Sequence, residues 1–354
     1  MKEEEKISKQ GLSKRLTVEC IEFFRTLLFV LIVQQSTFKK VASKGMFSHF
    51  GRVLLQDSTN ISLPKKLAAL FPGSKNQSNK PTAIMKIQSI YNLLSEKFVS
   101  FKVTPYTYND QRASSDILAF LRKRDIVLRD LGYFKVEVLK EIADKDAYFL
   151  SRYLYKTNIY DEKENKINLL EYLNKYGALD VNLYLGAMIK LPVRIVAIPL
   201  PQGVASERKR KLRQNRDKRL KVSKEQFALL DWNIFITNMP HSVWNTKIVA
   251  IMYGIRWRIE TIFKTWKSHF NLTVMTEGSS HYVETLIYAK LIWITLFQVV
   301  FRQLYVYVFK MTGKHLSLLK VAQIIQQNFW ALILIVASNK RLDTILEQIG
   351  KHCC

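Results

Sequence analysis

The stretch Tyr253-Gly-Ile-Arg256-Trp-Arg-Ile-Glu260-Thr-Ile-Phe-Lys-Thr-Trp-Lys267 combines polar and apolar residues at helical spacing. On a helical wheel of ~100° per residue, Tyr253, Arg256, Glu260 and Lys267 share an arc of about 60°. An adjoining arc is apolar, with Ile255, Ile259, Ile262, Phe263, Trp266 and Phe270. The pattern predicts a helix that packs on a core with one side and presents a tyrosine, a carboxylate and two cations on the other.

Arg256 and Glu260 are four residues apart, so a surface ion pair worth roughly a few tenths of a kcal/mol is one interpretation. It accounts for neither Tyr253 nor Lys267. A carboxylate among cations at the edge of a core instead indicates a site where a metal ion and a phosphate meet, and such a site needs further carboxylates.

Two aspartates upstream share a similar context. Asp57 follows the apolar run 53–55 and precedes Ser58-Thr59, and Asp130 follows the run 126–128 and precedes Leu131-Gly132-Tyr133. Each is predicted to end a buried strand just before a turn, where a side chain is held rigidly and stays open to a ligand. Two Mg²⁺ ions ~3.5–4 Å apart require carboxylates placed in this way. Taken singly, an aspartate before a turn is usually only a turn former or a cap.

Taken together, these motifs resemble those of the bacterial DDE transposases of the insertion sequence 4 family. That family's signature Y-x2-R-x3-E-x6-K is matched by the four polar residues of the predicted helix, and its two aspartate motifs are similar to Asp57-Ser-Thr and Asp130-Leu-Gly-Tyr. The resemblance covers residues 51–310. It implies an α/β fold with a ribonuclease-H-like catalytic core, a β-rich insertion before the glutamate helix, and helical N- and C-terminal segments.

The resemblance also implies a function. The chain would cut the ends of a mobile DNA element and join them to target DNA by phosphoryl transfer. Asp57, Asp130 and Glu260 would hold two Mg²⁺ ions, or Mn²⁺, while Arg256 and Lys267 would bind adjacent phosphates and Tyr253 would hydrogen-bond one. Two alternatives stay open: a metal-dependent nuclease of the same fold that does not join DNA, and a catalytically dead DNA-binding remnant.

The organisation of the chain agrees with an α/β domain. Residues 1–50 are predicted as a helical segment, 51–310 as the catalytic domain with a β-rich insertion at about 156–205, and 311–354 as a helical tail. Short apolar runs followed by polar turns predict strands at 53–55, 83–90, 98–103, 126–128, 148–150, 195–198 and 233–237. Helical spacing predicts helices at 113–122 and 242–270.

The charge indicates a polyanionic partner. Fifty-five lysines and arginines against 29 aspartates and glutamates give a formal net charge of +26, and nucleic acid is the first candidate. Residues 207–224 hold ten basic and two acidic side chains, beginning with Arg208, Lys209, Arg210 and Lys211. We expect this run to contact the phosphates of double-stranded DNA, both the terminal inverted repeats and the target, although a solvated helical face is the simpler alternative.

Trp232 begins a predicted strand 28 residues before Glu260. The family resemblance implies that the DNA end is opened through a hairpin, and that a tryptophan near this place holds a base flipped out of the DNA. Packing of Trp232 in the core is the alternative. We also expect a homodimer in the DNA complex.

The cellular setting is predicted from what the sequence lacks. Three cysteines without a disulfide or zinc spacing fit a reducing bacterial cytoplasm, where the protein would associate with the nucleoid. The apolar runs 27–33 and 291–301 are shorter than the roughly 20 residues that span a bilayer, so both are predicted as buried helices, with neither a membrane contact nor a signal peptide.

Since 56 residues precede Asp57, residues 1–50 are predicted to be a shortened DNA-binding region that discriminates the element's own ends poorly. The cations it offers are Lys9, Lys14, Arg15, Arg25, Lys39, Lys40 and Lys44.

Overall fold

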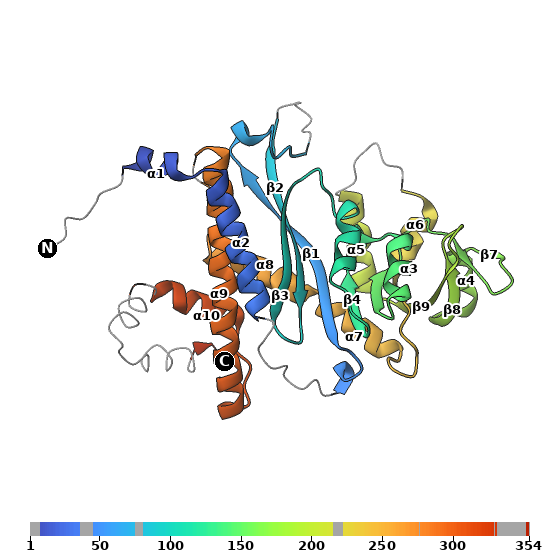
Figure 1. The fold of residues 1–354 in the computed structure, drawn as a ribbon. Coiled ribbons are helices and arrows are strands. Elements are labelled where there is room, and N and C mark those ends of the chain that lie inside the picture. The colour runs from blue at the N-terminus through green and yellow to red at the C-terminus, as the bar shows by residue number, and fades with distance from the viewer. Residues whose placement is uncertain are drawn as a thin grey trace. The chain divides into compact units, whose positions relative to one another are not determined.

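The computed structural model of the chain describes residues 8–35, 45–74, 81–214, 222–275, 277–328, 330 and 352–353. The chain forms two compact units, which we call the first unit (residues 1–40, 58–108 and 258–354) and the second unit (residues 41–57 and 109–257). Both combine strands and helices (Figure 1). Of the predicted N-terminal cations, Lys39, Lys40 and Lys44 lie outside the described residues, as do residues 215–221 of the basic run.

The second unit is built on a mixed sheet with the strand order β1-β4-β5-β10-β9-β8-β6-β7. Strand β4 pairs in parallel with β1 and with β5. The other neighbours, β5 with β10, β10 with β9, β9 with β8, β8 with β6 and β6 with β7, pair antiparallel. The strands are β1 (Arg52–Leu63, of which residues up to 57 belong to this unit), β4 (Asp125–Arg129), β5 (Tyr148–Arg152), β6 (Ile159–Tyr160), β7 (Lys166–Ile167), β8 (Leu179–Leu185), β9 (Leu191–Pro199) and β10 (Trp232–Thr237).

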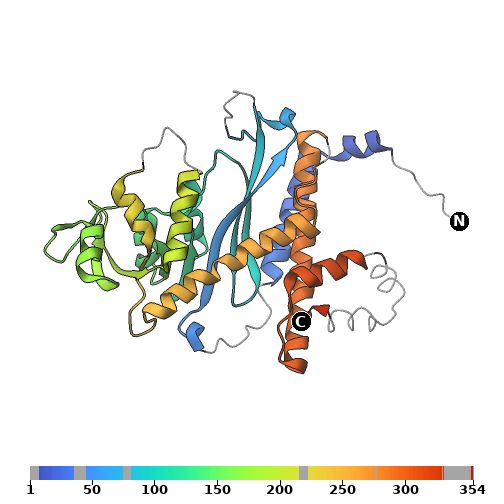
Figure 2. The same ribbon diagram turned by 180° about the vertical axis from the view of Figure 1, so that it is seen from behind.

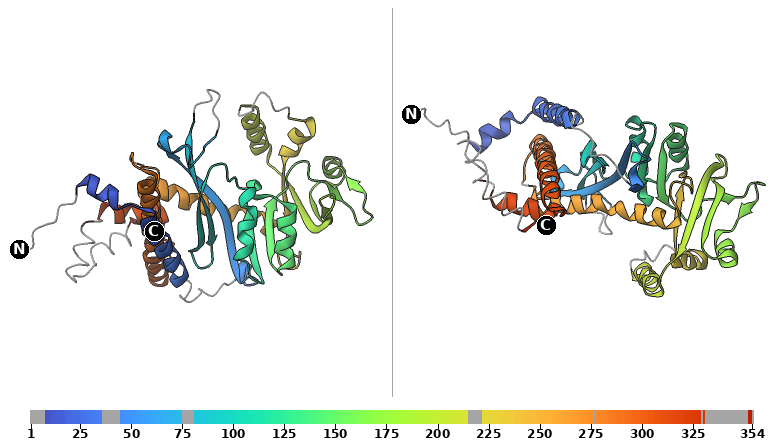
Figure 3. Two further views of the ribbon diagram at one scale, coloured as in Figure 1. Left: turned by 45° about the horizontal axis from the view of Figure 1, so that its top comes forward. Right: turned by 90° about the horizontal axis from the view of Figure 1, so that it is seen from below.

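Burial on both faces explains why the parallel strands are continuous apolar runs. Leu54 pairs with Val127 across β1 and β4, and both are fully buried, as is typical of parallel strands covered by helices. The helices of this unit are α3 (Val136–Asp144), α4 (Leu169–Tyr176), α5 (Gln202–Gln214), α6 (Lys224–Ala228) and α7 (Thr246–Ile255), with 3₁₀ turns η1 (Gly45–Phe47), η3 (Arg112–Ala119), η4 (Leu131–Tyr133) and η5 (Leu229–Asp231). Helices α5 and α6, olive and yellow in Figure 3, both contact η5.

The first unit contains the antiparallel pair β2 (Ala83–Asn92) and β3 (Lys97–Pro105), with β2 next to β1. Its helices are α1 (Lys9–Arg15), α2 (Val18–Gln35), α8 (Trp257–His269, from residue 258 onward), α9 (Ser280–Thr312) and α10 (Leu318–Gln327), with the turn η2 (Lys65–Leu67). Figure 2 shows α8 and α9 from behind. Trp266 of α8 packs its ring 5.1 Å from that of Phe98 on β3, and α2 packs along α9.

Three local predictions differ from the structure. The predicted helix 113–122 is a shorter 3₁₀ helix, η3, which ends at Ala119. The predicted helix 242–270 is two helices that meet at Arg256, where the backbone N–H donates to the carbonyl of Tyr253 three residues earlier. Tyr253 therefore belongs to α7, while Glu260 and Lys267 belong to α8, and the single wheel does not hold. Asp57 does not end its strand, because β1 continues beside β2 as far as Leu63.

The two apolar helices are less buried than predicted. Leu28 of α2 is buried, but the exposed fractions of Phe23 and Phe29 are 62% and 65%, and Val300 on α9 is 48% exposed. Each helix buries only the side that packs on its neighbours, although a helix that is apolar all round is ordinarily buried. The run 291–301 also belongs to a helix of 33 residues, which is long and apolar enough by composition to cross a membrane, with half of its most apolar window buried in the protein. The run 291–301 is thus only a part of this helix, and its lack of membrane contact stays a prediction.

Candidate active site

Strand register brings the two aspartates together. Gln56 of β1 pairs with Arg129 of β4 in parallel. The residues that follow these two along the chain, Asp57 and Asp130, therefore lie at the same edge of the second unit's sheet. Asp130 directly follows β4, as predicted, and precedes η4. The Asp57 side chain is 15% exposed and that of Asp130 is 46% exposed. Adjacent parallel strands thus present two neighbouring carboxylates, one half-buried and one open to solvent.

Arg256 lies between these carboxylates. Its Nη1 is 3.2 Å from Oδ2 of Asp57, its Nη2 is 3.7 Å from Oδ1 of Asp130, and its side chain is 6% exposed. The break between α7 and α8 places the arginine at the end of α7. A guanidinium that faces two carboxylates compensates charges that would otherwise repel each other at the sheet edge.

Tyr253 lies one turn before Arg256 on α7 and packs on Phe235 of β10, with ring centroids 5.1 Å apart. It is 8% exposed, and its hydroxyl has no hydrogen-bond partner among the residues that the structure describes. Burial raises the pKa of this phenol above its ordinary value, against the opposing effect of the positive charge on Arg256. The hydroxyl therefore stays protonated at neutral pH and can donate one hydrogen bond.

Arg152 is a site residue that the sequence did not reveal. It ends β5 opposite Phe235 of β10. Its positive charge acts on the Tyr253 phenol, where it lowers the pKa. It also acts on Arg208, where burial lowers the pKa most and repulsion from Arg152 lowers it further. Its only sequence signal is a cation just after the apolar run 148–150. The second unit thus places a second cation, besides Arg256, within electrostatic range of the Tyr253 phenol.

Trp232 is the first residue of β10 and lies opposite Pro199 of β9. It is neither fully buried nor fully exposed. Its ring is therefore not simply a core side chain, and its proposed contact with a DNA base stays a prediction.

The four named cations of the basic run lie on α5 and already have partners. Arg208 donates from Nη2 to Oδ1 of Asn233 at 2.8 Å. Lys209 lies 2.6 Å from Asp231. Arg210 and Lys211 lie 2.7 and 3.6 Å from Glu207, and the hydrogen bond from Arg210 contributes most to lowering the pKa of Glu207 to about 2. These exposed pairs reduce the charge that the described part of the run can offer to DNA, and its role in binding stays a prediction.

Glu260 and Lys267 lie on α8, in the first unit. Ile259, Ile262, Phe263 and Trp266 are buried, which confirms the apolar side of this helix, whereas Glu260 is half-buried and Lys267 is exposed. Arg258 fixes the start of α8 through an ion pair with Glu96, at 3.3 Å between Nη2 and Oε1. Within the described ranges, no three His, Cys, Asp or Glu side chains stand together as ligands for one metal ion. The structure thus unites Asp57, Asp130, Tyr253 and Arg256, and the addition of Glu260 and Lys267 stays a prediction.

Known proteins are similar in sequence to this chain over most of its length. The family described as "Transposase DDE domain" matches residues 48–296. The transposase for insertion sequence element IS231D of Bacillus thuringiensis subsp. finitimus is 30% identical over 381 aligned residues, which cover 98% of this chain and 78% of the relative. The transposase for IS231F of Bacillus thuringiensis subsp. israelensis is 27% identical, with 97% and 76% covered.

A more distant relative, the transposase for IS1151 of Clostridium perfringens, is 25% identical over 81% of this chain and 64% of its own length. The stretch that matches the DDE domain holds all three predicted carboxylates, Asp57, Asp130 and Glu260, and covers well over half of the chain. The chain therefore belongs to the transposase DDE domain family.

Proposed function

We propose that this chain is the DNA transposase of an insertion sequence of the insertion sequence 4 type, and that Asp57, Asp130 and Glu260 are its catalytic carboxylates. The observation that carries the proposal is the pair Asp57 and Asp130, which follow register-paired residues of two parallel strands and face one guanidinium at 3.2 and 3.7 Å. Both lie within the stretch that matches the DDE domain, and so does Glu260.

The donor set fits a divalent cation. Carboxylate oxygens are the ligands that Mg²⁺ and Mn²⁺ prefer, and Asp57 and Asp130 already meet around one positive charge. Glu260, in the first turn of α8, would be the third ligand, and we propose Mg²⁺ as the physiological ion. When bound, such an ion supplies Lewis acidity and lowers the pKa of the attacking hydroxyl.

The protein's own groups would bind and orient the scissile phosphate. In phosphoryl transfer an attacking oxygen forms a bond to phosphorus while the bond to the leaving 3′-oxygen or 5′-oxygen breaks, and negative charge gathers on the phosphate oxygens. Arg256 is a fork-shaped donor suited to those oxygens. The protonated hydroxyl of Tyr253, which lacks a partner among the described residues, can donate to one of them. Lys267, exposed on α8, would bind a phosphate further along the strand.

The architecture supports a ribonuclease-H-like core as part of the proposal. Three parallel strands, β1, β4 and β5, stand at the centre, and residues 156–205 add the strands β6 to β9 before β10 and α7. We propose residues 51–310 as the catalytic domain, with this strand-rich segment as its insertion, and a homodimer on double-stranded DNA. The described cysteines, Cys20 and Cys353, form no disulfide with each other, which is compatible with the reducing cytoplasm that we propose as the site of action.

The test uses the full chain with a duplex that bears the element's end, a target plasmid, and Mg²⁺, Mn²⁺ or EDTA. We expect metal-dependent nicks and joined products from the wild type, and neither from D57N, D130N or E260Q. D146N is the matched control, because Asp146 is an exposed carboxylate of the second unit that pairs with Lys123. Nicks without joining would support the nuclease alternative, binding without cleavage would support the inactive remnant, and full cleavage by a triad variant would exclude that residue.

A further inference from the structure

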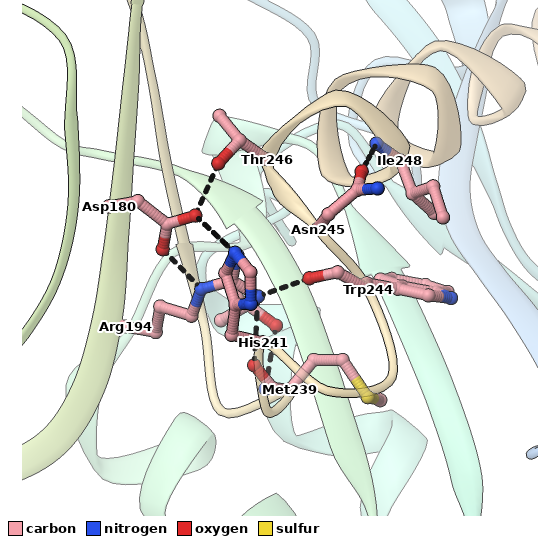
Figure 4. A network of polar contacts seen from close by, with 9 residues as sticks. Asp180, Arg194, Met239, His241, Trp244, Asn245, Thr246 and Ile248 are labelled. Carbon is pink, nitrogen blue, oxygen red and sulfur yellow. Dashed lines mark hydrogen bonds and ion pairs between the residues drawn. The ribbon is translucent and has the colours of Figure 1, made fainter.

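The segment between β10 and α7 wraps around one buried guanidinium of the second unit (Figure 4). Arg194 of β9 donates from Nη1 to the carbonyl of Trp244 at 2.6 Å and to that of Met239 at 3.3 Å. Two backbone carbonyls of one loop are thus held by one side chain that is 4% exposed. The loop begins where β10 ends and leads directly into the helix that carries Tyr253.

Asp180 of β8 holds this guanidinium from the other side. Its Oδ1 accepts from Nε of Arg194 at 2.5 Å and its Oδ2 from Nη2 at 2.6 Å. The same Oδ2 accepts a short hydrogen bond from the hydroxyl of Thr246, the first residue of α7, and lies 3.6 Å from Nε2 of His241. Burial acts to raise the pKa of Asp180, but the hydrogen bonds from Arg194 and Thr246 outweigh it and hold the pKa below its ordinary value.

The start of α7 is therefore fixed by several independent contacts. Asn245 caps the helix by accepting from the backbone N–H of Ile248 at 3.0 Å. Trp244 is fully buried, and its ring N–H donates to the carbonyl of Met46 at 3.2 Å. Because a buried guanidinium is costly to leave without its carboxylate, and Arg194 is buried while Asp180 is only partly exposed, the loop has little freedom to shift while both partners are present.

We propose that Asp180, Arg194 and Thr246 are positioning residues for the reaction. They clamp the first turn of α7 to strands β8 and β9, and α7 then presents Tyr253 and Arg256 to the carboxylates. The strand-rich segment 156–205 would thus act on the catalytic centre without contributing a group to it. This inference rests on the proposed function, because it assigns Tyr253 and Arg256 to the reaction.

The geometry sets the expected size of the effect. Tyr253 and Arg256 lie about two to three turns beyond Thr246, at ~1.5 Å per residue along the axis. A small tilt at the start of the helix therefore displaces the phenol and the guanidinium. A misplacement of ~1 Å near reacting groups can cost about 100-fold in rate.

The experiment compares T246V, T246S and D180N with D125N in the full chain. Asp125 is the matched control, because it forms a buried pair with Arg52, with Oδ1 3.0 Å from Nε, but lies at the far end of β4 from Asp130. Each variant is measured for melting temperature, DNA affinity and single-turnover cleavage rate. The environment of Tyr253 is followed by ¹⁹F NMR of protein labelled with 3-fluorotyrosine, in which the Y253F variant identifies the resonance.

We expect T246V to slow cleavage about 10-fold and D180N about 100-fold, with DNA affinity nearly unchanged and a shifted or broadened Tyr253 resonance. T246S keeps the hydroxyl and should behave like the wild type, and D125N should lose melting temperature but neither rate nor the Tyr253 signal. Equal rate losses in D180N and D125N, or an unchanged Tyr253 resonance in both T246V and D180N, would overturn the proposal. If the wild type itself cleaves no DNA, the proposed function fails, and the NMR comparison alone decides whether the clamp positions Tyr253.

Discussion

Arg256 is the residue on which the second unit's carboxylates converge. Its guanidinium is buried, and it supplies the positive charge that lets Asp57 and Asp130 stand side by side. The sequence predicted that all three belong to one site. It did not predict that the arginine contacts both aspartates, because the helix that carries it breaks at that residue.

Replacement of Arg256 by alanine should make the protein's stability depend on divalent metal. Without the guanidinium, Asp57 and Asp130 repel each other, and a bound cation stabilises the folded state by mass action. We expect Mn²⁺ to raise the melting temperature of R256A by more than that of the wild type, and D57N/R256A to lose most of this gain. Melting curves with Mn²⁺ or EDTA measure the effect, and an equal response of R256A and wild type would contradict the arrangement.

Trp232 offers a second test at the level of one side chain. By hypothesis it stacks a base extruded near the cleaved end, and such stacking contributes ~1–3 kcal/mol. W232A should then impair hairpin formation more than the first nick, and an abasic position opposite the ring should partly restore it. A lowered melting temperature without rescue would assign Trp232 to packing alone.

At the level of elements, the strands were easier to predict than their ends. The runs 83–90, 98–103, 126–128, 148–150, 195–198 and 233–237 all lie within observed strands, because strands that pack on a core are rich in apolar side chains. The polar residues 58–60 continue β1 beyond Asp57, and only the neighbouring strand β2 makes that extension favourable. The Asp180–Arg194 pair was likewise hidden, since it depends on how β8 and β9 pair.

Helix α5 carries a prediction about DNA affinity. Neutralising Arg208, Lys209, Arg210 and Lys211 should weaken binding to end and non-end duplexes alike, because each phosphate contact contributes about 0.9 to the slope of log affinity against log salt. The pairs with Glu207 and Asp231 reduce this contribution, so E207Q should steepen the slope. Affinity titrations over a range of salt concentrations measure both, and unchanged slopes would assign α5 to a solvated face.

At the level of the whole molecule, the net charge of +26 and the DDE domain point to the same substrate. The sequence sufficed to predict the DDE transposase family, because the family's motifs are short and local. The prediction that Glu260 shares one metal centre with Asp57 and Asp130 does not rest on a local signal. It depends on how residues far apart along the chain come together on DNA, so it calls for a direct measurement.

The stability of the second unit should depend on acid through Asp180. The pKa of this carboxyl is lower in the folded protein than its ordinary value, so its contribution is present above the unfolded-state pKa, near 3.9, and is lost as the pH falls through the folded-state value. The difference in melting temperature between wild type and D180N should therefore be largest near neutral pH and shrink below about pH 4. A difference that stays constant with pH would show that the Asp180 charge does not stabilise the fold.

The most direct test of the central claim counts metal ions in the protein–DNA complex. Electron paramagnetic resonance of free Mn²⁺ gives the number bound to each chain, with D146N as the control. We predict two bound ions for wild type and D146N, and loss of at least one in each of D57N, D130N and E260Q. Wild-type stoichiometry and affinity in E260Q would contradict it, because Asp57, Asp130 and Glu260 would then not share one metal centre.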